Sequence, residues 1–431
     1  MKIRAAQTVR GKVSLPGDKS ISHRAAIFSA LAAGTTRITN YASSEDCRST
    51  VDCLAALGVT AEFSGSTLTV GGVGKNGLAA SASPLDCGNS GTTMRLMAGV
   101  LAGQPFRSTL VGDASLQKRP MRRVADPLEQ MGAAIASTDG RAPLTIDGKQ
   151  PLASIEYRLP VASAQIKSCI LLAGLNARGR TTVIEPVPTR DHTERMLRWF
   201  GVDVTREERP DGAAISVSGD AELAARDLNI PSDISSAAFL IAAAAGLAGS
   251  ELEIANVGLN PTRTAVLEAF RGLGARIEIA DMTDSSNEPA GTIRVTGGLS
   301  DNGRGVLGLS GATIANLIDE VPILAVLGSQ SAAGIEIREA GELRHKESDR
   351  IKAVADNLRR MNADVEEFPD GLRVGRSDLK GAVIDSCGDH RIAMAFAIAA
   401  LFAEGETEIE GASASAVSFP DFFEVLGSIT A

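Results

Sequence analysis

The sequence predicts an α/β protein with two similar domains, each of three repeated βαβαββ-type units, six in all, around an interdomain cleft. The main observation is a repeat in which a helix of small residues is followed by a glycine and then by a β-rich run, as in "ALAAGTTRI" and "ALFAEGETEI". A glycine there suits the left-handed position that ends a helix before a strand. Six copies occur along the chain, at Gly34, Gly103, Gly179, Gly249, Gly334 and Gly405.

A second helix follows in each copy and ends in Gly or Asn before another β-rich run, as in "CLAALGVTAEF" and "MLRWFGVDV". Helices and strands therefore alternate, which is typical of α/β folds. The sixth copy, "FFEVLGSITA", runs out of chain just after Gly427. The N-terminal "KIRAAQTVRGKVSLPG" has the pattern of a strand that ends in a Pro-Gly turn, so we expect it to supply the missing strand.

Six copies in 431 residues suggest two domains of three copies each. The boundary is expected near "RDLNIPSD", at residues 226–233. We therefore expect a first domain at 18–228 and a second at 229–431 that residues 1–17 complete. The two crossings would then serve as a hinge. The alternative is that helix–glycine–strand recurs in any α/β protein.

Composition excludes several classes of protein. The formal net charge is −9 and aromatic residues make up 3%, which argues against a nucleic-acid binder. No apolar run has the length of a membrane span, and the N-terminus lacks a signal-peptide core, so we expect a cytoplasmic protein without membrane contact. The five cysteines are scattered and lack metal-site spacing, so we expect reduced, structural thiols and no metal.

Polar residues gather about 15 positions before each of the six glycines, where each helix should begin. Their central residues are Lys19, Asn89, Gln165, Asp233, Asp319 and His390. Helix N-termini carry unpaired N–H groups and a partial positive charge. Small side chains at these places are expected to cap the free donors: Ser20, Asn89, Ser163 and Ser232.

Capping does not explain the cations in the same clusters, which are Lys19, Arg24, Lys167 and Arg391. A cation at a helix N-terminus is unfavourable unless it has an anionic partner. We therefore predict a small ligand with several negative charges, bound between the domains. A second charged run, "RHKESDR" at 344–350, has cations at Lys346 and Arg350. It allows a further anion site or, alternatively, a solvated helix face with an intrahelical ion pair.

Eight segments together make the chain resemble the 5-enolpyruvylshikimate-3-phosphate synthases, a family of enolpyruvyl transferases. They occur in the family's order along essentially the whole chain: "LPGDKSISHR", "DCGNSGTTMR", "QKRPM", "ASAQIKS", "TRDHTERML", "LIDEVPIL", "RHKESDRI" and "CGDHRIAMA". The resemblance implies transfer of the enolpyruvyl group of phosphoenolpyruvate to the 5-hydroxyl of shikimate 3-phosphate, by addition and elimination, in the shikimate pathway of aromatic amino-acid biosynthesis. It also implies no metal or organic cofactor and inhibition by glyphosate. We expect a monomer whose domains draw together on shikimate 3-phosphate, because like-charged helix starts from both sides would repel until an anion bridges them.

The same resemblance assigns the binding residues. Shikimate 3-phosphate should be held by Ser20, Arg24, Ser163 and Arg190, and phosphoenolpyruvate by Lys19, Gly91, Arg119, Lys346, Arg350 and Arg391. Gln165 should lie between the two substrates. Asn89, Ala164 and Asp319 complete the substrate-binding set. Lys167 is expected to add a contact to the shikimate phosphate, since Ala164 stands where some members have Ser.

For the chemistry, the resemblance points to Asp319 and Glu347. Asp319 would take the hydroxyl proton, whereas Glu347 would protonate the methylene carbon and later remove a proton during elimination. Lys19 and His390 would stabilise the departing phosphate or relay protons. The chain departs from many members at "ASASAVSFPDFF", which lacks the lysine that they carry there. Gly91 stands where glyphosate-sensitive members have Gly, which predicts competitive inhibition.

Two other readings of the residues stay open at this point. The sister enolpyruvyl transferases that act on UDP-N-acetylglucosamine share the six-unit fold, but they have a Lys-Asn pair and a reactive loop cysteine. Here the pair is Lys19-Ser20, and Cys87 and Cys169 fall at expected helix starts. A noncatalytic anion-binding protein of the same fold should have lost Asp319 or Glu347, and both are present.

Overall fold

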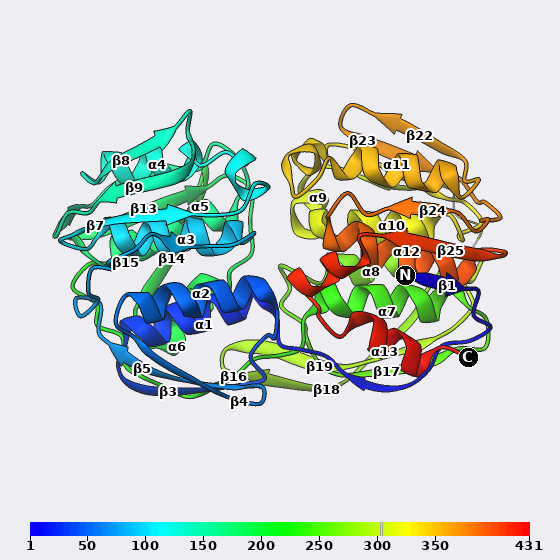
Figure 1. The fold of residues 1–431 in the computed structure, drawn as a ribbon, viewed down its shortest axis with the longest axis horizontal. Coiled ribbons are helices and arrows are strands. Elements are labelled where there is room, and N and C mark those ends of the chain that lie inside the picture. Colours follow the sequence, from blue (N-terminus) through cyan, green and yellow to red (C-terminus); the bar gives the residue numbers. More distant parts are fainter. Residues whose placement is uncertain (302, 304) are drawn as a thin grey trace. The chain divides into compact units, whose positions relative to one another are not determined.

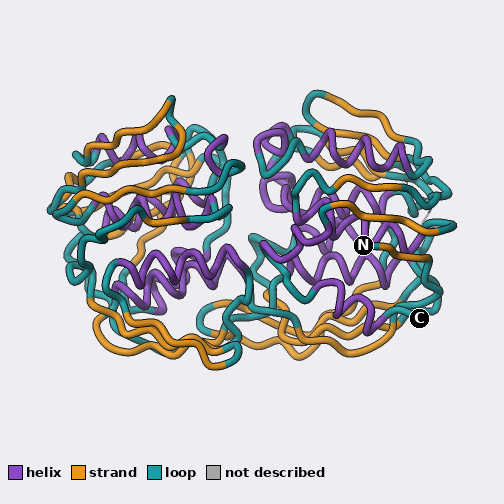
Figure 2. Tube along the Cα trace, viewed as in Figure 1, coloured by secondary structure: helices purple, strands orange, loops and turns teal. Residues whose placement is uncertain are grey.

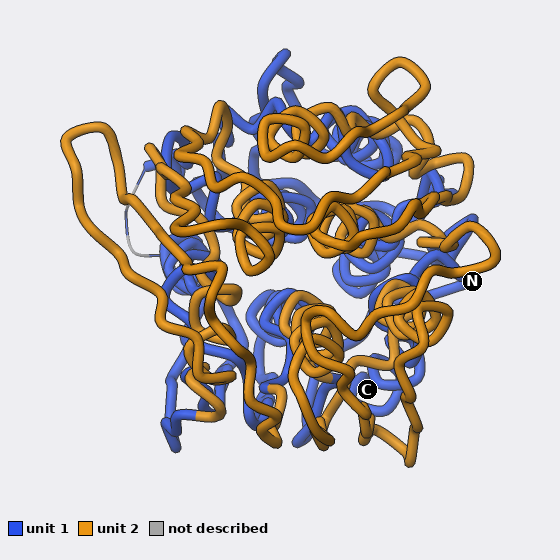
Figure 3. Tube along the Cα trace, turned by 90° about the vertical axis from the view of Figure 1, so that its left-hand side faces the viewer, with its two compact units in different colours: residues 1–16, 231–284, 289–431 blue, residues 17–230, 285–288 orange. Residues whose placement is uncertain are grey.

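The chain folds into two compact units, shown in a computed structural model that describes residues 1–301, 303 and 305–431. Unit 1 contains residues 1–16, 231–284 and 289–431, and unit 2 contains residues 17–230 and 285–288 (Figure 3). The short segment 285–288 belongs to unit 2 because Ser285 Oγ donates to Asn229 O at 3.0 Å and Asn229 N donates to Ser286 Oγ at 3.2 Å. The sequence gives no sign of this excursion.

Unit 2 contains three four-stranded sheets of one design, in the orders β16-β3-β5-β4, β6-β7-β9-β8 and β11-β13-β15-β14. In each, the first pair is parallel and the other pairs are antiparallel. The strands are β3 (Ala33–Thr39), β4 (Thr60–Ser64), β5 (Thr67–Val73), β6 (Leu85–Asp86), β7 (Arg107–Val111), β8 (Ala134–Thr138), β9 (Arg141–Asp147), β11 (Glu156–Arg158), β13 (Arg180–Glu185), β14 (Val204–Arg209), β15 (Gly212–Ser218) and β16 (Leu228–Asn229), with a small pair of β10 (Leu152–Ala153) and β12 (Ala177–Arg178).

Unit 1 contains three more sheets, in the orders β18-β19-β17-β2, β20-β21-β23-β22 and β1-β25-β24 (Figure 1). Their strands are β1 (Lys2–Arg4), β2 (Arg10–Ser14), β17 (Glu251–Gly258), β18 (Arg276–Ser285), β19 (Glu288–Thr296), β20 (Leu307–Leu309), β21 (Ile335–Ile337), β22 (Val365–Phe368), β23 (Gly371–Val374), β24 (Val383–Asp385) and β25 (Glu406–Glu410). The predicted α/β fold of six similar copies, three in each unit, is confirmed.

The N-terminal segment completes the sixth copy, as expected. Strand β1 pairs antiparallel with β25, with Ile3 opposite Thr407. The sequence predicted one strand here, whereas the structure has two in different sheets, because β2 pairs in parallel with β17 in the fourth copy. The break between them is held by the last residue, since Gln7 N donates to Ala431 O at 2.8 Å.

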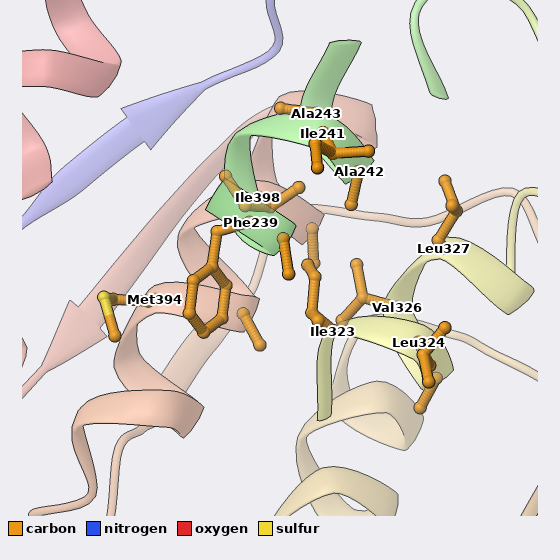
Figure 4. Packing of buried hydrophobic residues seen from close by; sticks show 14 of the residues in the cluster. Phe239, Ile241, Ala242, Ala243, Ile323, Leu324, Val326, Leu327, Met394 and Ile398 are labelled. Carbon is orange, nitrogen blue, oxygen red and sulfur yellow. The ribbon is translucent and has the colours of Figure 1, made fainter. Parts of the chain in front are cut away.

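The helices are of two kinds, which Figure 2 shows interleaved with strands in each unit. The first helix of each copy is buried on nearly all sides: α1 (Lys19–Leu31), α3 (Gly91–Ala102), α5 (Ala164–Gly174), α7 (Ile234–Gly246), α10 (Val321–Gly328) and α12 (His390–Phe402). Figure 4 shows α7, α10 and α12 meeting through Phe239, Ile323 and Ile398. Small side chains allow these helices to approach closely, which explains the alanine-rich runs.

The second helix of each copy covers the core with one apolar side: α2 (Glu45–Ala56), α4 (Arg122–Gln130), α6 (His192–Trp199), α8 (Ala265–Gly272), α11 (Arg350–Arg360) and α13 (Phe422–Ile429). One further helix, α9 (Ala312–Leu317), and four 3-10 turns fill the connections: η1 (Leu116–Lys118), η2 (Ile318–Glu320), η3 (Gly341–His345) and η4 (Ala412–Val417). Among the described residues no helix has the length and apolar character needed to cross a membrane.

One of the six repeat glycines differs from the expectation. Five have positive φ, for example 113° at Gly34 and 100° at Gly405, whereas Gly103 has φ −87° at the end of α3. Gly103 is needed for space instead, because a Cβ there would lie 2.7 Å from the Cβ of Asn176. The repeat is therefore structural at all six places, but for two different physical reasons.

Candidate active site

The helix starts of unit 2 are capped, but partly by other residues than the sequence suggested. Asp18 Oδ1 accepts from Ile21 N at 2.9 Å, and Ser90 Oγ accepts from Thr93 N at 3.1 Å. The expected caps Ser20 and Asn89 are therefore wrong, and only Ser163, on α5, is confirmed. In unit 1, Asp233 rather than Ser232 caps α7. Each expected cap that fails lies one or two residues from the true one, which leaves its side chain for other contacts.

Lys19 opens α1 and has an internal partner. Its Nζ donates to Asp46 Oδ2 at 2.9 Å, and Asp46 lies in the first turn of α2. The ammonium is partly exposed, while the carboxylate is nearly buried. Asp46 was missed by the sequence analysis, because nothing in the spacing of the two residues indicates that α2 folds back on the start of α1.

The start of α3 brings Asn89, Gly91 and Arg119 together. Arg119 Nη2 donates to Asn89 Oδ1 at 2.7 Å, and Asn89 Nδ2 donates to Asp113 Oδ2 at 2.7 Å. A Cβ on Gly91 would lie 2.9 Å from Arg95 Nη1 and 3.2 Å from Arg119 Nη1. The glycine therefore leaves room for two guanidinium groups beside a helix N-terminus, an arrangement suited to a carboxylate or phosphate.

Gln165, in the first turn of α5, is held at both ends of its amide. Its Oε1 accepts from Arg95 Nη1 at 2.6 Å, and its Nε2 donates to Thr92 Oγ1 at 2.9 Å. Arg95 was missed as a site residue. A signal existed, since Arg95 follows Gly91 by one helical turn in "GTTMR" and so projects from the same face of α3.

Arg24 is a buried arginine on α1. Its Nε donates to Thr193 Oγ1 at 2.7 Å, its Nη2 to Ser168 Oγ at 2.8 Å and its Nη1 to Ser20 O at 2.8 Å. Burial, with a smaller contribution from the nearby Arg190, lowers the pKa of Arg24 to about 10, against the opposing effects of Glu194 and Asp18. The group remains charged at neutral pH, and Arg24 and Arg190 form a second cationic centre in unit 2.

Lys167 does not fit its predicted role. Its side chain is 0% exposed, and its Nζ lies 3.0 Å from Glu185 Oε1 and 2.7 Å from Glu194 Oε1. A cation near a helix N-terminus needs an anionic partner, and for Lys167 two carboxylates of the protein supply it. The ammonium is sealed inside unit 2, so the structure lends no support to the predicted contact between Lys167 and the shikimate phosphate.

In unit 1, Asp319 lies in η2, directly before α10, and accepts two cations. Lys346 Nζ donates to Asp319 Oδ1 at 3.1 Å, and Arg350 Nη1 donates to the same oxygen at 3.4 Å. Arg391 Nη1, from the first turn of α12, donates to the Asp319 carbonyl at 2.7 Å. These residues come from two copies of the repeat, the fifth and the sixth.

Arg350 is the centre of this cluster. Its Nη2 donates to Glu347 Oε2 at 2.6 Å and its Nε to Asp389 Oδ2 at 2.8 Å. The Asp319 and Glu347 side chains are 15% and 16% exposed, whereas Asp389 is sealed. The alternative of a solvated helix face is therefore wrong for Arg350, although its pair with Glu347 is indeed local in sequence.

The electrostatics follow from this packing. Burial opposes charge on Arg350, but Asp389, Glu347 and Asp319 together raise its pKa above the ordinary value. Burial likewise disfavours the Asp389 carboxylate, yet Arg350 holds its pKa below the ordinary value, aided by His390. Arg350 and Asp389 thus remain an ionised pair. His390 opens α12 with its ring buried.

Glu320 is a further residue that the sequence analysis missed. It is buried, and its Oε1 accepts from Arg391 Nη1 at 3.3 Å and from Ser235 Oγ. Ser235 Oγ in turn accepts from Arg263 Nη2 at 2.7 Å. Glu320 was overlooked because it directly follows Asp319, and the polar cluster at this helix start does not indicate that the two carboxylates have different partners.

No group of three or more His, Cys, Asp or Glu side chains suited to a metal occurs among the residues that the structure describes. All five cysteines are free, and only Cys387 is exposed. Cys87 and Cys169 are buried, and burial raises the pKa of the Cys169 thiol to about 12. These thiols are therefore structural, as expected.

A family profile described as EPSP synthase (3-phosphoshikimate 1-carboxyvinyltransferase) matches residues 3–426. The chain belongs to this family. It is 48% identical to the 3-phosphoshikimate 1-carboxyvinyltransferase of Solibacter usitatus over 99% of both chains. The corresponding protein of Koribacter versatilis is 49% identical over 100% of this chain and 99% of its own. The structure of EPSP synthase from Acinetobacter baumannii matches with a TM-score of 0.86 at 42% identity, covering 99% of this chain and 97% of that one.

Membership of the EPSP synthase family establishes the activity: transfer of the enolpyruvyl group of phosphoenolpyruvate to shikimate 3-phosphate in the shikimate pathway. The substrates are small molecules. The sister family that acts on UDP-N-acetylglucosamine and the noncatalytic alternative are not favoured, because the relatives named above match over their full lengths. EPSP synthases are the target of glyphosate, as the resemblance implied.

Proposed function

We propose that this chain carries out EPSP synthesis with Asp319 as the base for the attacking hydroxyl and Glu347 as the group that exchanges a proton with the methylene carbon. One observation carries the assignment: among the three carboxylates on Arg350, these two keep an exposed part, while Asp389 is sealed. A group that transfers protons to a substrate must reach it, so Asp389 is left with the task of holding Arg350 in place.

We assign the anionic ends of the substrates to the cationic centres. Arg24, Arg190, Ser20 and Ser163 would hold shikimate 3-phosphate, with Ala164 alongside. Lys19, Gly91, Arg119, Lys346, Arg350 and Arg391 would hold phosphoenolpyruvate, with Asn89 orienting Arg119 and Gln165 between the substrates. Arginine suits both ligands because its planar fork donates two parallel hydrogen bonds to a phosphate or carboxylate. The support is that Arg190 lies close enough to Arg24 to lower its pKa, and that the guanidinium groups of Arg95 and Arg119 lie beside Gly91.

The two steps of the reaction balance with these groups. In the addition, Glu347 gives a proton to the methylene carbon of phosphoenolpyruvate, the 5-hydroxyl oxygen bonds to the adjacent carbon, and the hydroxyl proton passes to Asp319. In the elimination, Glu347 takes a proton back from the new methyl group, the bond from carbon to the phosphate oxygen breaks, and the proton on Asp319 leaves with phosphate. Lys19 and His390 are assigned to the departing phosphate and to proton relay.

Phosphate release from phosphoenolpyruvate tests the proposal, with shikimate 3-phosphate and then UDP-N-acetylglucosamine as acceptor. We expect release only with shikimate 3-phosphate. Glu347→Gln should lower kcat by about 10²–10⁴-fold, the usual range for losing an acid–base group. The control Asp378→Asn replaces a carboxylate that is 89% exposed and should leave kcat unchanged. Near-parental turnover in Glu347→Gln would refute the assignment of that residue.

Three further features are proposed: a cytoplasmic monomer, no affinity for nucleic acid, and closure of the chain on shikimate 3-phosphate. Sedimentation should give one chain per particle, and small-angle scattering should give a smaller radius of gyration with shikimate 3-phosphate than without it. Equal radii would contradict closure.

A further inference from the structure

Lys167 is a cation in a place where cations are rarely found. The side chain leaves the first turn of α5 and is completely buried between Glu185, at the end of β13, and Glu194, on α6. Both carboxylates are themselves buried. An ammonium sealed between two carboxylates joins three elements of the third copy, and removing it would leave buried negative charge without compensation.

The charges of this interior balance only when Arg24 is counted. Glu194 is the strongest favourable charge acting on the buried Arg24, so one carboxylate serves both cations. Lys167 and Arg24 carry two positive charges, and Glu185 and Glu194 carry two negative ones. If Lys167 were neutral, Glu194 would still act on Arg24, and one negative charge of this set would have no partner.

The same residues are linked to the groups proposed to bind shikimate 3-phosphate. Thr189, the residue before Arg190, donates through its Oγ1 to Glu185 Oε1. Thr193 and Ser168, the neighbours in sequence of Glu194 and Lys167, lie 2.6 Å apart through their hydroxyl oxygens, and both accept hydrogen bonds from Arg24. Ser168 Oγ also donates to Ala164 O at 2.6 Å, which ties the network to the start of α5.

We propose that Lys167 is a positioning residue for shikimate 3-phosphate. It neutralises Glu185 and Glu194, and so leaves Arg24 and Arg190 available to an anionic substrate instead of to the carboxylates behind them. This inference rests on the proposed function of Arg24 and Arg190. It assigns Lys167 an effect on substrate affinity without any contact with the substrate.

The test is the variant Lys167→Met, whose side chain has a similar length but no charge. We expect KM for shikimate 3-phosphate to rise about tenfold or more, as is typical when a buried charge loses its partner. We expect kcat and KM for phosphoenolpyruvate to stay within about threefold, since the residues assigned to them lie elsewhere. The double variant Lys167→Met/Glu185→Gln restores charge balance and keeps an acceptor for Thr189, so its KM should return close to the parental value.

A matched control is Lys75→Met, which removes the other buried lysine of unit 2. Lys75 Nζ donates to Gly219 O at 2.7 Å and to Ala221 O at 2.8 Å, neither of which belongs to the proposed site. Its loss should lower the thermal midpoint of unfolding and leave KM unchanged. If Lys167 had a merely structural role, Lys167→Met would likewise lower the midpoint of unfolding and leave KM unchanged.

Two outcomes overturn the inference. A parental KM in folded Lys167→Met would show that Lys167 does not position the site, and an equally raised KM in the double variant would show a direct contact with the substrate. If Lys167→Met does not fold, Lys167→Met/Glu185→Gln and Lys167→Met/Glu185→Ala replace it. Both are charge-balanced, so both KM values should lie close to the parental value, and a KM raised about tenfold or more in both would overturn the inference. Absent activity in the parental chain would instead refute the proposed function.

Discussion

Lys167 of unit 2 and Arg350 of unit 1 are both almost completely buried cations, but the carboxylates that neutralise them differ in exposure. Lys167 lies between two carboxylates that are both sealed from solvent. Arg350 is held by three carboxylates, of which Asp319 and Glu347 keep one side exposed. A lysine presents a compact charge, whereas the arginine fork spans several acceptors in one plane. The comparison suggests that unit 2 uses its network to hold binding groups still, and unit 1 uses its network to present reactive ones.

The largest effect is expected from Arg350→Met. It leaves three carboxylates together without their cation, which should cost about 3–5 kcal/mol of unfolding free energy and remove turnover. Urea unfolding and a phosphate-release assay measure the two effects. Arg107→Met is the matched control, because Arg107 also pairs with a carboxylate, Asp147, but at the surface. Equal losses of unfolding free energy in Arg350→Met and Arg107→Met would show that the buried ion pairs contribute no more to stability than the surface pair.

A smaller effect is expected at Glu320, which holds Arg391 in unit 1. Glu320→Ala removes the acceptor of Arg391 and Ser235, so KM for phosphoenolpyruvate should rise about tenfold, the equivalent of one charged hydrogen bond. Glu320→Gln keeps an acceptor and should stay within about threefold. Steady-state kinetics with saturating shikimate 3-phosphate separates the two. Equal KM values in both variants would mean that Glu320 does not orient Arg391.

Gly91→Ala should have a moderate effect on unit 2. The new Cβ would lie 2.9 Å from Arg95 Nη1 and 3.2 Å from Arg119 Nη1, so at least one guanidinium must shift. We expect a severalfold rise in KM for phosphoenolpyruvate and weaker inhibition by glyphosate, which should compete with phosphoenolpyruvate in the parental chain. Inhibition that is unchanged in Gly91→Ala would show that these arginines do not form the shared subsite.

The smallest effect is a loss of stability in mild acid that comes from His23. This histidine on α1 is buried, its Nδ1 lies 2.6 Å from Thr50 Oγ1, and burial lowers its pKa below the ordinary value, assisted by Lys19 and Arg24 and opposed by Asp18. Below a pH of about 6.5 the unfolded chain binds a proton that the folded chain refuses, so stability is full above that pH and falls below it. In His23→Gln the thermal midpoint of unfolding should change less between about pH 7.5 and about pH 5.5 than in the parental chain. These two values lie about one unit on either side of the unfolded pKa of histidine. An equal slope in the variant would refute this origin.

The sequence was sufficient to predict the architecture, because the repeat pattern depends mostly on residues that lie close together in the chain. The glycine that ends each first helix and the alanine-rich core helices depend on neighbours in the chain, and the returning N-terminal strand follows from the incomplete sixth copy. The exception, β2, pairs with β17 across more than 200 residues, and no local pattern could indicate that register.

The candidate site was predictable only in part. Polar residues at helix starts identified Lys19, Gln165, Asp319 and Arg391, since each departs from its helical pattern. The sequence could not show which cations already have partners inside the protein. Glu185 and Glu194 reach Lys167 from a strand and a helix of the same copy, and only the fold brings them together. Asp46 was missed for the same reason. Arg95 could have been found from its spacing to Gly91, whereas Glu320 was overlooked because it directly follows Asp319.

The central claim is that unit 2 holds shikimate 3-phosphate and that Asp319 of unit 1 performs chemistry on it. Its most direct test is the calorimetric dissociation constant of shikimate 3-phosphate for Asp319→Ala, measured beside its turnover. We predict a dissociation constant within about threefold of the parental value and a kcat lower by about 10²-fold or more. A dissociation constant raised in proportion to the loss of turnover would contradict this division of roles.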